Sequence, residues 1–291
     1  MARVAVVGLG AMGSRVAQRL LLAGNEVVVW NRSPQKIEPL LRLGAQSAQT
    51  PRLAAEQSEV VITMVADPAA LEAVTEGPVG VAAGAGPGSG LIEMSTVGPA
   101  AIRRLASELP DGVGLVDAPV LGSIAEAEAG TLTIFAGGRE EDVDAVEPLL
   151  RQLGTVRRVG ALGAGAAAKL VANATLIGTM AVLGEALSLA QTLGLSREQA
   201  AAVLASTPLA EQAEKRLPVI AAGSYPPRFK LSLARKDADL ISEASRSAGA
   251  RMRALEAARQ WLAEAESQGR GDQDYSAVLA TILEGSDSIR S

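Results

Sequence analysis

Residues 4–13 read VAVVGLGAMG, and this stretch decides the fold of the chain. A short apolar strand leads directly into the motif G-x-G-x-x-G, and a helical pattern follows over residues 14–23. In such a motif Gly8 permits a tight turn, Gly10 lets the backbone approach a pyrophosphate, and Gly13 lets the helix pack closely on the strand. The sequence therefore predicts a βαβ unit that binds a dinucleotide.

The end of the second predicted strand, residues 27–30, indicates which dinucleotide is bound. Asn31-Arg32-Ser33 follows this strand, about 20 residues beyond the glycines, where NAD sites carry an Asp or Glu for the ribose hydroxyls. Asn31 has no charge to repel a 2′-phosphate, and the Arg32 guanidinium can bind one with two hydrogen bonds. NADP(H) is therefore favoured over NAD(H). The alternative is that Arg32 is an ordinary solvated loop residue.

Length and composition limit the remaining possibilities. A chain of 291 residues suits two domains, and its net charge of −5 argues against a nucleic-acid partner. The chain has no cysteine and no histidine, which excludes disulfides and thiolate metal sites. Any acid–base step must then use Lys, Asp, Glu, Tyr or water.

The pattern along the chain gives no sign of a leader or a membrane segment. The apolar N-terminal stretch is broken by glycines and by Arg15, unlike a signal peptide. The longest uncharged apolar stretch, between Lys169 and Glu185, is shorter than the ~20 residues that span a bilayer, and it contains Asn173. We expect a cytoplasmic protein with no membrane partner.

Two types of pattern divide the chain near residue 160. The first part alternates short β-branched runs with helical patterns, as in a parallel doubly wound sheet. Helical periodicity replaces strands afterwards, beginning with a long helix from Gly163 to about Leu193. We predict an α/β fold: a Rossmann-type NADP-binding domain over 1–160 and an all-α substrate and dimerisation domain over 161–291, opened by that helix. The later strands are expected at 60–65, 91–94, 114–117, 131–136 and 155–159, and the later helices at 196–206, 208–222, 233–248 and 252–266.

Polar residues follow several of these strands. Asp67, Ser95, Thr96 and Asp117 would lie along the carboxyl edge of the sheet, where open α/β sheets bind ligands. The same residue types also cap helices, and both roles stay open for them.

The long helix carries the candidate catalytic pair. Lys169 and Asn173 are four residues apart, so they project from one face of the helix among Ala, Leu and Val. A lysine in apolar surroundings is poorly hydrated, which suits it to proton transfer. The alternative is a lysine whose stem covers the helix while its ammonium group reaches water.

Further motifs follow the glycine motif in a fixed order: Asn31-Arg32-Ser33, EMSTVGP at 93–99, DAPV at 117–120, AEAGTL at 127–132, the stretch 163–173, and Lys236-Asp237. Together they resemble the β-hydroxyacid dehydrogenase family over nearly the whole chain. That family includes 3-hydroxyisobutyrate dehydrogenases and NADPH-dependent glyoxylate and succinic semialdehyde reductases, and the spacing is more similar to the latter.

The resemblance implies a Rossmann domain and a helical domain with the substrate in the cleft between them, and a homodimer or homotetramer. It implies Lys169 as the catalytic residue with Asn173 as its neighbour. The expected cofactor residues are Gly8, Leu9, Gly10, Ala11, Met12, Gly13, Asn31, Arg32, Ser33, Met64, Val65, Ala66, Thr96 and Lys236. The expected substrate residues are Ser95, Leu121, Gly122, Ser123, Phe229 and Asp237.

One departure from the family pattern concerns the substrate. The family normally reads Asp-Ala-Pro-Val-Ser-Gly, whereas this chain has Leu121 in place of the serine, followed by Gly122 and Ser123. Leu121 cannot donate a hydrogen bond to a substrate carboxylate. Either Ser123 and backbone N–H groups hold that carboxylate, or the substrate lacks one and packs an apolar group on Leu121. Imine reductases resemble this chain at Leu121 but generally lack the lysine that it keeps at Lys169.

These observations predict an NADP(H)-dependent dehydrogenase or reductase that acts on a small aldehyde, keto acid or β-hydroxy acid. Lys169 would serve as general acid or base, Asn173 would orient the reacting oxygen, and no metal would be needed. Imine reduction on the same scaffold is the alternative, and a non-catalytic NADP-binding protein is a third hypothesis.

Overall fold

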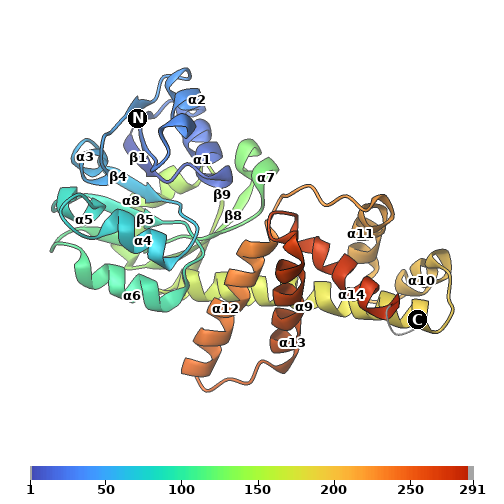
Figure 1. Cartoon of the computed structure of the whole chain (residues 1–291). Helices are drawn as coiled ribbons and strands as arrows, with labels where there is room; N and C mark the ends of the chain where they lie inside the picture. The colour runs from blue at the N-terminus through green and yellow to red at the C-terminus, as the bar shows by residue number, and fades with distance from the viewer. Residues whose placement is uncertain (1, 288–291) are drawn as a thin grey trace. The chain divides into compact units, whose positions relative to one another are not determined.

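The computed structural model describes residues 2–287 of the chain (Figure 1). The chain folds as two compact units, Met1–Leu170 and Val171–Ser291. The first contains the β-strands, and the second is helical. The expected domain boundary, between residues 160 and 161, lies just before helix α9, whereas the two units meet inside that helix.

The first unit is built on one nine-stranded sheet. The strands run in the order β3-β2-β1-β4-β5-β6-β8-β7, and β9 pairs with β8. Strands β1 to β6 pair in parallel, as the alternation of strands and helices predicts. The strand bounds are β1 (Arg3–Val7), β2 (Glu26–Trp30), β3 (Gln46–Ser47), β4 (Val60–Thr63), β5 (Gly90–Glu93), β6 (Gly114–Asp117), β7 (Val120–Leu121), β8 (Leu132–Gly138) and β9 (Gly154–Gly160).

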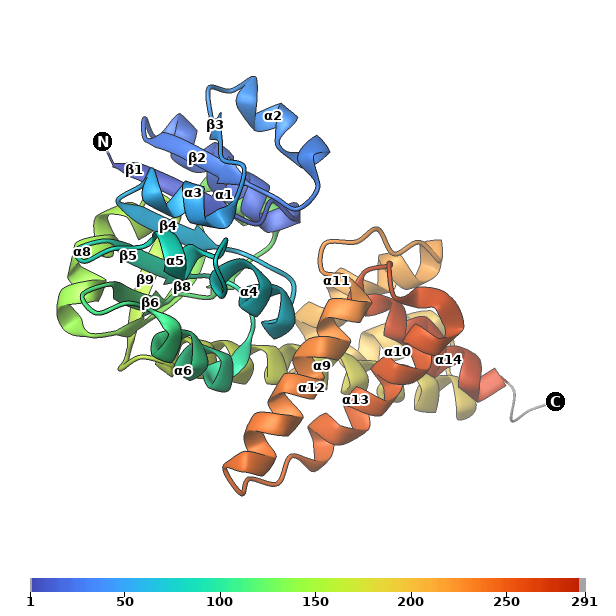
Figure 2. The same cartoon turned by 60° about the vertical axis from the view of Figure 1, so that its left-hand side comes forward.

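Both faces of this sheet are buried. Along β1, Val4 and Val6 belong to one hydrophobic cluster, and Ala5 and Val7 belong to another, because alternate side chains point to opposite faces. Residues of α1 and α8 fill the first cluster, and residues of α4 and α6 fill the second, so helices lie on both sides of the sheet (Figures 1 and 2). The helices of this unit are α1 (Ala11–Leu22), α2 (Glu38–Leu41), α3 (Pro51–Glu56), α4 (Pro68–Thr75), α5 (Val81–Gly84), α6 (Gly98–Glu108), α7 (Ile124–Ala129) and α8 (Glu140–Leu150).

Strand β8 corrects the expectation of an all-parallel sheet. It pairs antiparallel with both β6 and β7, and only β9 runs parallel to it. The helix between β6 and β8, α7, has six residues and is about 9 Å long. The chain continues from β6 into β7, turns at α7, and returns antiparallel alongside β7 and then β6 as β8, in the manner of a hairpin.

Within the described residues, the second unit contains the C-terminal part of α9 (Ala164–Thr192) and five further α-helices. The expected helices are present, and the closing helix α14 was not foreseen. Gly184 lets α14 approach α9, because a β-carbon at Gly184 would overlap Ile282. The Rossmann-type sheet followed by helices, opened by one long helix, is confirmed. The bounds are α10 (Arg197–Leu204), α11 (Ala210–Ala222), α12 (Leu231–Ser247), α13 (Arg253–Ala265) and α14 (Val278–Asp287).

Helix α9 spans almost the predicted range, from Gly163 to about Leu193, and it is strongly apolar. Among the described residues it is the one helix long and apolar enough to cross a membrane by length and composition. Its most apolar window has a mean hydropathy of 1.6, and 44% of that window is buried inside the fold. The core helix of a soluble protein meets the same criterion, so this property does not by itself indicate a membrane span.

Candidate active site

The glycine loop joins β1 to α1 at the carboxyl edge of the sheet. Gly8 has a φ of +101°, and its N–H donates to the carbonyl oxygen of Trp30 at 3.0 Å. A β-carbon at Gly8 would overlap the carbonyl oxygen of Met64, and one at Gly13 would overlap the carbonyl oxygen of Gly8. The packing of the unit itself therefore requires glycine at both positions.

Gly10 differs from these two glycines. Its φ of −69° is open to any residue, and a β-carbon there would meet no atom within 4 Å. Gly10 precedes the first turn of α1, where no side chain caps the helix. The N–H groups at this end of α1 and the space above Gly10 fit the pyrophosphate of a dinucleotide. The protein's own packing thus explains Gly8 and Gly13 but not Gly10, and close approach of a bound pyrophosphate would explain Gly10.

Asn31 connects the glycine loop to the turn after β2. Its side-chain oxygen accepts a hydrogen bond from the N–H of Leu9 at 2.9 Å, and its amide nitrogen donates to the carbonyl oxygen of Ser33 at 3.0 Å. The sequence indicated only that Asn31 is uncharged, and this bridge was not foreseen. Arg32 is exposed, and within residues 2–287 its side chain has no hydrogen-bond or ion-pair partner. Its guanidinium is available to an anionic ligand.

Ser95 links the ends of two neighbouring strands. Its hydroxyl oxygen accepts a hydrogen bond from the N–H of Val65 at 2.8 Å, and its own N–H donates to the Glu93 carboxylate at 2.8 Å. These contacts bring the segment 64–66 after β4 beside the segment 95–96 after β5. The predicted cofactor residues Met64, Val65, Ala66 and Thr96 thus lie on one edge with the glycine loop.

Two of the polar residues at this edge cap helices. The Asp67 carboxylate accepts a hydrogen bond from the N–H of Ala70 at 2.7 Å and caps α4. The buried Asp117 carboxylate accepts hydrogen bonds from the N–H of Gly163 at 2.8 Å and of Ala166 at 2.6 Å. Burial outweighs these hydrogen bonds and raises the pKa of Asp117 to about 6. Asp117 therefore attaches the first turn of α9 to the end of β6. Lys169 lies on α9 one turn after Ala166 and is partly buried.

The loop after β6 contains the predicted substrate residues Leu121, Gly122 and Ser123. Leu121 is partly buried in the short strand β7, and Gly122 has a φ of +133°. Both the N–H and the hydroxyl of Ser123 donate hydrogen bonds to one oxygen of the Glu126 carboxylate, at 2.7 and 2.8 Å. The role of Glu126 was missed, although Ser-x-x-Glu before a helix is a known capping-box pattern that could have indicated it.

A second group of predicted residues lies in the helical unit. Asn173 on α9 is buried, and its amide nitrogen donates to the buried Asp237 carboxylate on α12 at 2.5 Å. The ammonium group of Lys236 lies 2.6 Å from the other oxygen of that carboxylate. The carbonyl oxygen of Asn173 is buried and has no hydrogen-bond partner within the described part of the chain. Because Nδ2 is committed to Asp237, this oxygen is an acceptor whose hydrogen-bonding capacity is unused within residues 2–287.

Phe229 lies in the segment before α12, and a second segment holds its backbone in place. The Asp274 carboxylate accepts hydrogen bonds from the N–H groups of Arg228 and Phe229, at 3.2 and 3.1 Å. The N–H of Tyr275 donates to the carbonyl oxygen of Phe229 at 2.7 Å, and the two rings pack with their centroids 5.4 Å apart. Asp274 and Tyr275 thus fix Phe229, and no sequence motif indicated this.

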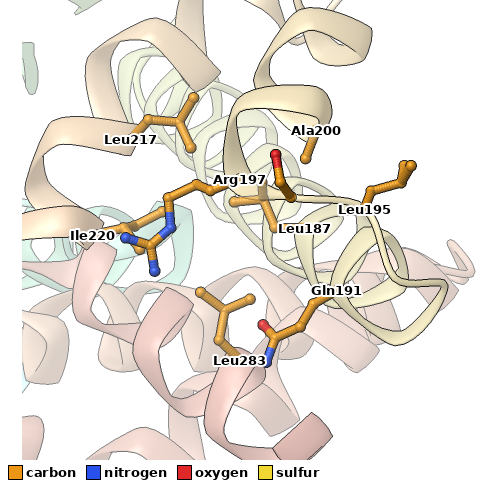
Figure 3. Close-up of a pocket in the computed structure, with 9 residues that line it drawn as sticks. Leu187, Gln191, Leu195, Arg197, Ala200, Leu217, Ile220 and Leu283 are labelled. Atoms are coloured by element: carbon orange, nitrogen blue, oxygen red, sulfur yellow. The ribbon is translucent and has the colours of Figure 1, made fainter.

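The helical unit also contains a cavity of about 240 Å³ among α9, α10, α11 and α14 (Figure 3). Figure 3 shows apolar side chains around it, with the polar groups of Arg197 and Gln191. None of the predicted catalytic, cofactor or substrate residues lines this cavity, so it is separate from the candidate active site. The apolar lining of the cavity includes Leu187, Leu195, Leu217, Ile220 and Leu283.

Across residues 2–287, no group of three or more acidic side chains is arranged to hold a metal ion.

Comparison with known proteins identifies the family. The model of the NAD-binding domain of 6-phosphogluconate dehydrogenase matches residues 3–178, and the model of the NAD-binding domain of NADP-dependent 3-hydroxyisobutyrate dehydrogenase matches residues 163–282. A 2-(hydroxymethyl)glutarate dehydrogenase of Eubacterium barkeri is 31% identical over 281 residues, which cover 95% of this chain and 93% of the relative.

Two solved structures share the fold over almost their full length. The 3-hydroxyisobutyrate dehydrogenase of Mycobacterium tuberculosis, solved with L-serine, has a TM-score of 0.83 and 26% identity, with 97% of this chain and 99% of that chain covered. An imine reductase from a Pseudomonas species has a TM-score of 0.62 and 26% identity at the same coverage. The chain belongs to the β-hydroxyacid dehydrogenase family, as its motifs predict, and it is an oxidoreductase dependent on a pyridine nucleotide.

Proposed function

We propose that this protein uses NADP(H) and interconverts a small aldehyde or keto acid with the corresponding alcohol or β-hydroxy acid, with Lys169 exchanging the proton. The observation that carries this proposal is the setting of Asn173. Its buried side chain is oriented by Asp237, and its carbonyl oxygen has no partner within the described residues. Leaving a buried acceptor unsatisfied costs about 1–3 kcal/mol, so such a group is a candidate for ligand binding.

Lys169 supplies the proton-transfer group one helical turn before Asn173. Residues four apart on a helix lie on one face, so Lys169 and Asn173 share a face of α9. As an ammonium, Lys169 donates a proton to the oxygen that gains charge when a carbonyl is reduced, and as an amine it takes the proton back in oxidation. Asn173 orients either this lysine or the hydroxyl of the substrate. The nicotinamide, when bound, supplies or accepts the hydride.

The choice of NADP(H) rests on the turn after β2. The Asn31 amide is engaged by Leu9 and Ser33 and brings no negative charge to the ribose-binding position. The exposed guanidinium of Arg32 is free of partners within residues 2–287 and suits a 2′-phosphate. The loop residues 8–13 would hold the pyrophosphate.

A turnover screen with a lysine variant tests the proposal. Small aldehyde acids, keto acids and cyclic imines are assayed with NADPH for the unaltered protein, Lys169→Met and a control, Lys215→Met, which removes an exposed lysine paired with Glu211. Loss of a general acid lowers kcat by about 10²–10⁴-fold, while affinity for NADPH is kept. Near-native turnover of the best carbonyl substrate by Lys169→Met would contradict proton transfer by Lys169. Absence of turnover by the unaltered protein with every substrate would favour the non-catalytic NADP-binding hypothesis.

Imine reduction is the second candidate, and Leu121 supports it. This partly buried apolar residue stands where the family pattern has a serine, and an imine reductase is among the solved structures similar to this chain. A protonated iminium accepts hydride without a proton donor. If imines are the substrates, Lys169→Met should therefore keep most of its activity on a cyclic imine while losing activity on carbonyl compounds.

We also propose that the protein assembles as a homodimer or homotetramer. Exposed apolar side chains on α9, including Val171, Val182 and Leu189, support this, since they are at least half exposed in the single chain. Size-exclusion chromatography with light scattering tests it, and a monomeric mass at micromolar concentration would refute it. A cytoplasmic location and the absence of nucleic-acid or membrane partners stay predictions.

A further inference from the structure

We propose that the Glu126 carboxylate occupies the anion-binding position of the substrate loop, residues 121–123, so that the enzyme disfavours substrates with a carboxylate at that end. This inference rests on the proposed function and on the predicted contact of this loop with the substrate. It specifies the substrate class: a carbonyl compound or imine whose group facing the loop is apolar or cationic.

The hydrogen-bond donors of the loop carry the inference. Ser123 offers two donors, its N–H and its hydroxyl, and both point to the same Glu126 oxygen, at 2.7 and 2.8 Å. Leu121, the first residue of the loop, brings an alkyl side chain that donates nothing. The serine that could hold a substrate carboxylate in place of the missing family serine is therefore already bound to a carboxylate of the protein.

Contacts between α7 and α1 connect the helix that follows this loop with the helix that follows the dinucleotide loop. Arg15 on α1 pairs with Glu128 on α7 at 2.9 Å, and Arg19, one turn later on α1, lies against Gly130 just after α7. These contacts place α7 beside α1. Ser123 begins one helix, and the glycine loop begins the other.

A substrate carboxylate at this loop meets two obstacles. It must displace Glu126 from the Ser123 donors, and it must approach the negative charge of Glu126 at short range. A charged group that lacks one good hydrogen bond binds about 10- to 100-fold more weakly. Apolar groups avoid both costs and gain contact with Leu121, and cationic groups are attracted to the carboxylate.

The test compares 4-oxobutanoate with its methyl ester, in which the carboxylate is masked as an uncharged ester, and NADPH is the reductant. The unaltered protein should have the higher kcat/KM for the ester. Glu126→Ala frees both Ser123 donors and should raise the acid-to-ester ratio of kcat/KM by about 10- to 100-fold, mainly through KM for the acid. Glu126→Gln keeps the shape of the side chain, removes its charge and should raise the ratio by less.

Glu128→Gln is the matched control, because it removes one charge from the same helix at an exposed position. It should leave the ratio unchanged. A preference of the unaltered protein for the acid, or an unchanged ratio in both Glu126 variants, overturns the inference. Thermal unfolding of each variant shows whether it is folded, and the glutamine variant provides the result if the alanine variant is not.

A binding measurement separates this inference from the proposed function. If no carbonyl compound is turned over, the proposed function fails, and calorimetric titration of the NADP⁺-loaded protein with succinate tests Glu126 alone. Glu126→Ala should then bind succinate at least tenfold more tightly than the unaltered protein does, while affinity for dimethyl succinate changes little. Equal affinity of both proteins for succinate overturns the inference.

Discussion

Gly10 and Gly13 belong to one motif, and the structure predicts that their substitution by alanine has opposite consequences. A β-carbon at Gly13 would overlap the carbonyl oxygen of Gly8, whereas one at Gly10 would meet no atom within 4 Å. Gly13→Ala should therefore damage the fold. Gly10→Ala should leave the fold intact and interfere only with the bound dinucleotide.

The expected magnitudes follow from these contacts. Forcing an extra methyl group into a packed position costs about 1–3 kcal/mol, so the free energy of unfolding of Gly13→Ala should fall by at least that amount. At Gly10 the loss of a glycine N-cap and the lower entropy of the unfolded chain nearly cancel, and stability should change by less than about 1 kcal/mol. The methyl group at Gly10 enters the space assigned to the pyrophosphate, which should raise the Kd for NADPH by about 10- to 100-fold.

Two measurements on each variant check this prediction. Urea unfolding without cofactor gives stability, and titration with NADPH gives affinity. Gly86→Ala is the control. A β-carbon at Gly86 would also meet no atom within 4 Å, but Gly86 lies outside the predicted site. Native affinity of Gly10→Ala for NADPH would refute the assignment of this space to the cofactor. A loss of stability in Gly10→Ala equal to that of Gly13→Ala would refute the packing argument.

Two further predictions concern charge. Arg32→Ala should raise KM for NADPH by about one to two orders of magnitude and spare NADH, because one charge-assisted contact to a phosphate is worth about 1.5–3 kcal/mol, and equal effects on both cofactors in steady-state assays would contradict the role of Arg32. Burial raises the pKa of Asp117 from 3.8 to about 6, so the folded protein holds this proton more tightly than the unfolded chain does. The free energy of unfolding should therefore fall, by up to about 3 kcal/mol from this group, as the pH rises from about 4 to about 6. Asp117→Asn cannot titrate and should lack this component in urea unfolding between pH 4 and 7, and identical pH profiles of the two proteins would contradict it.

The sequence by itself determined the features that depend on neighbours in the chain. The strand, the glycine turn and the first helix are contiguous over residues 3–22, so local propensity and spacing specify them together. Lys169 and Asn173 share a face of α9 because helical geometry alone relates residues four apart. The pairing of Ser123 with Glu126 is also local, three residues apart, and its pattern could have been recognised before the structure.

Only the tertiary structure decided which distant groups meet. Asn31 accepts a hydrogen bond from the N–H of Leu9, Asp117 accepts hydrogen bonds from the first turn of α9, and Asp237 orients Asn173 across 64 positions of the chain. The antiparallel direction of β8 is likewise set by its pairing with β6 and β7 rather than by the composition of the strand. The packing of the backbone decides which polar groups come within hydrogen-bonding distance, and burial makes the pairing necessary because an unpaired buried group is costly. The sequence therefore specifies the polar groups, and the tertiary structure specifies their partners.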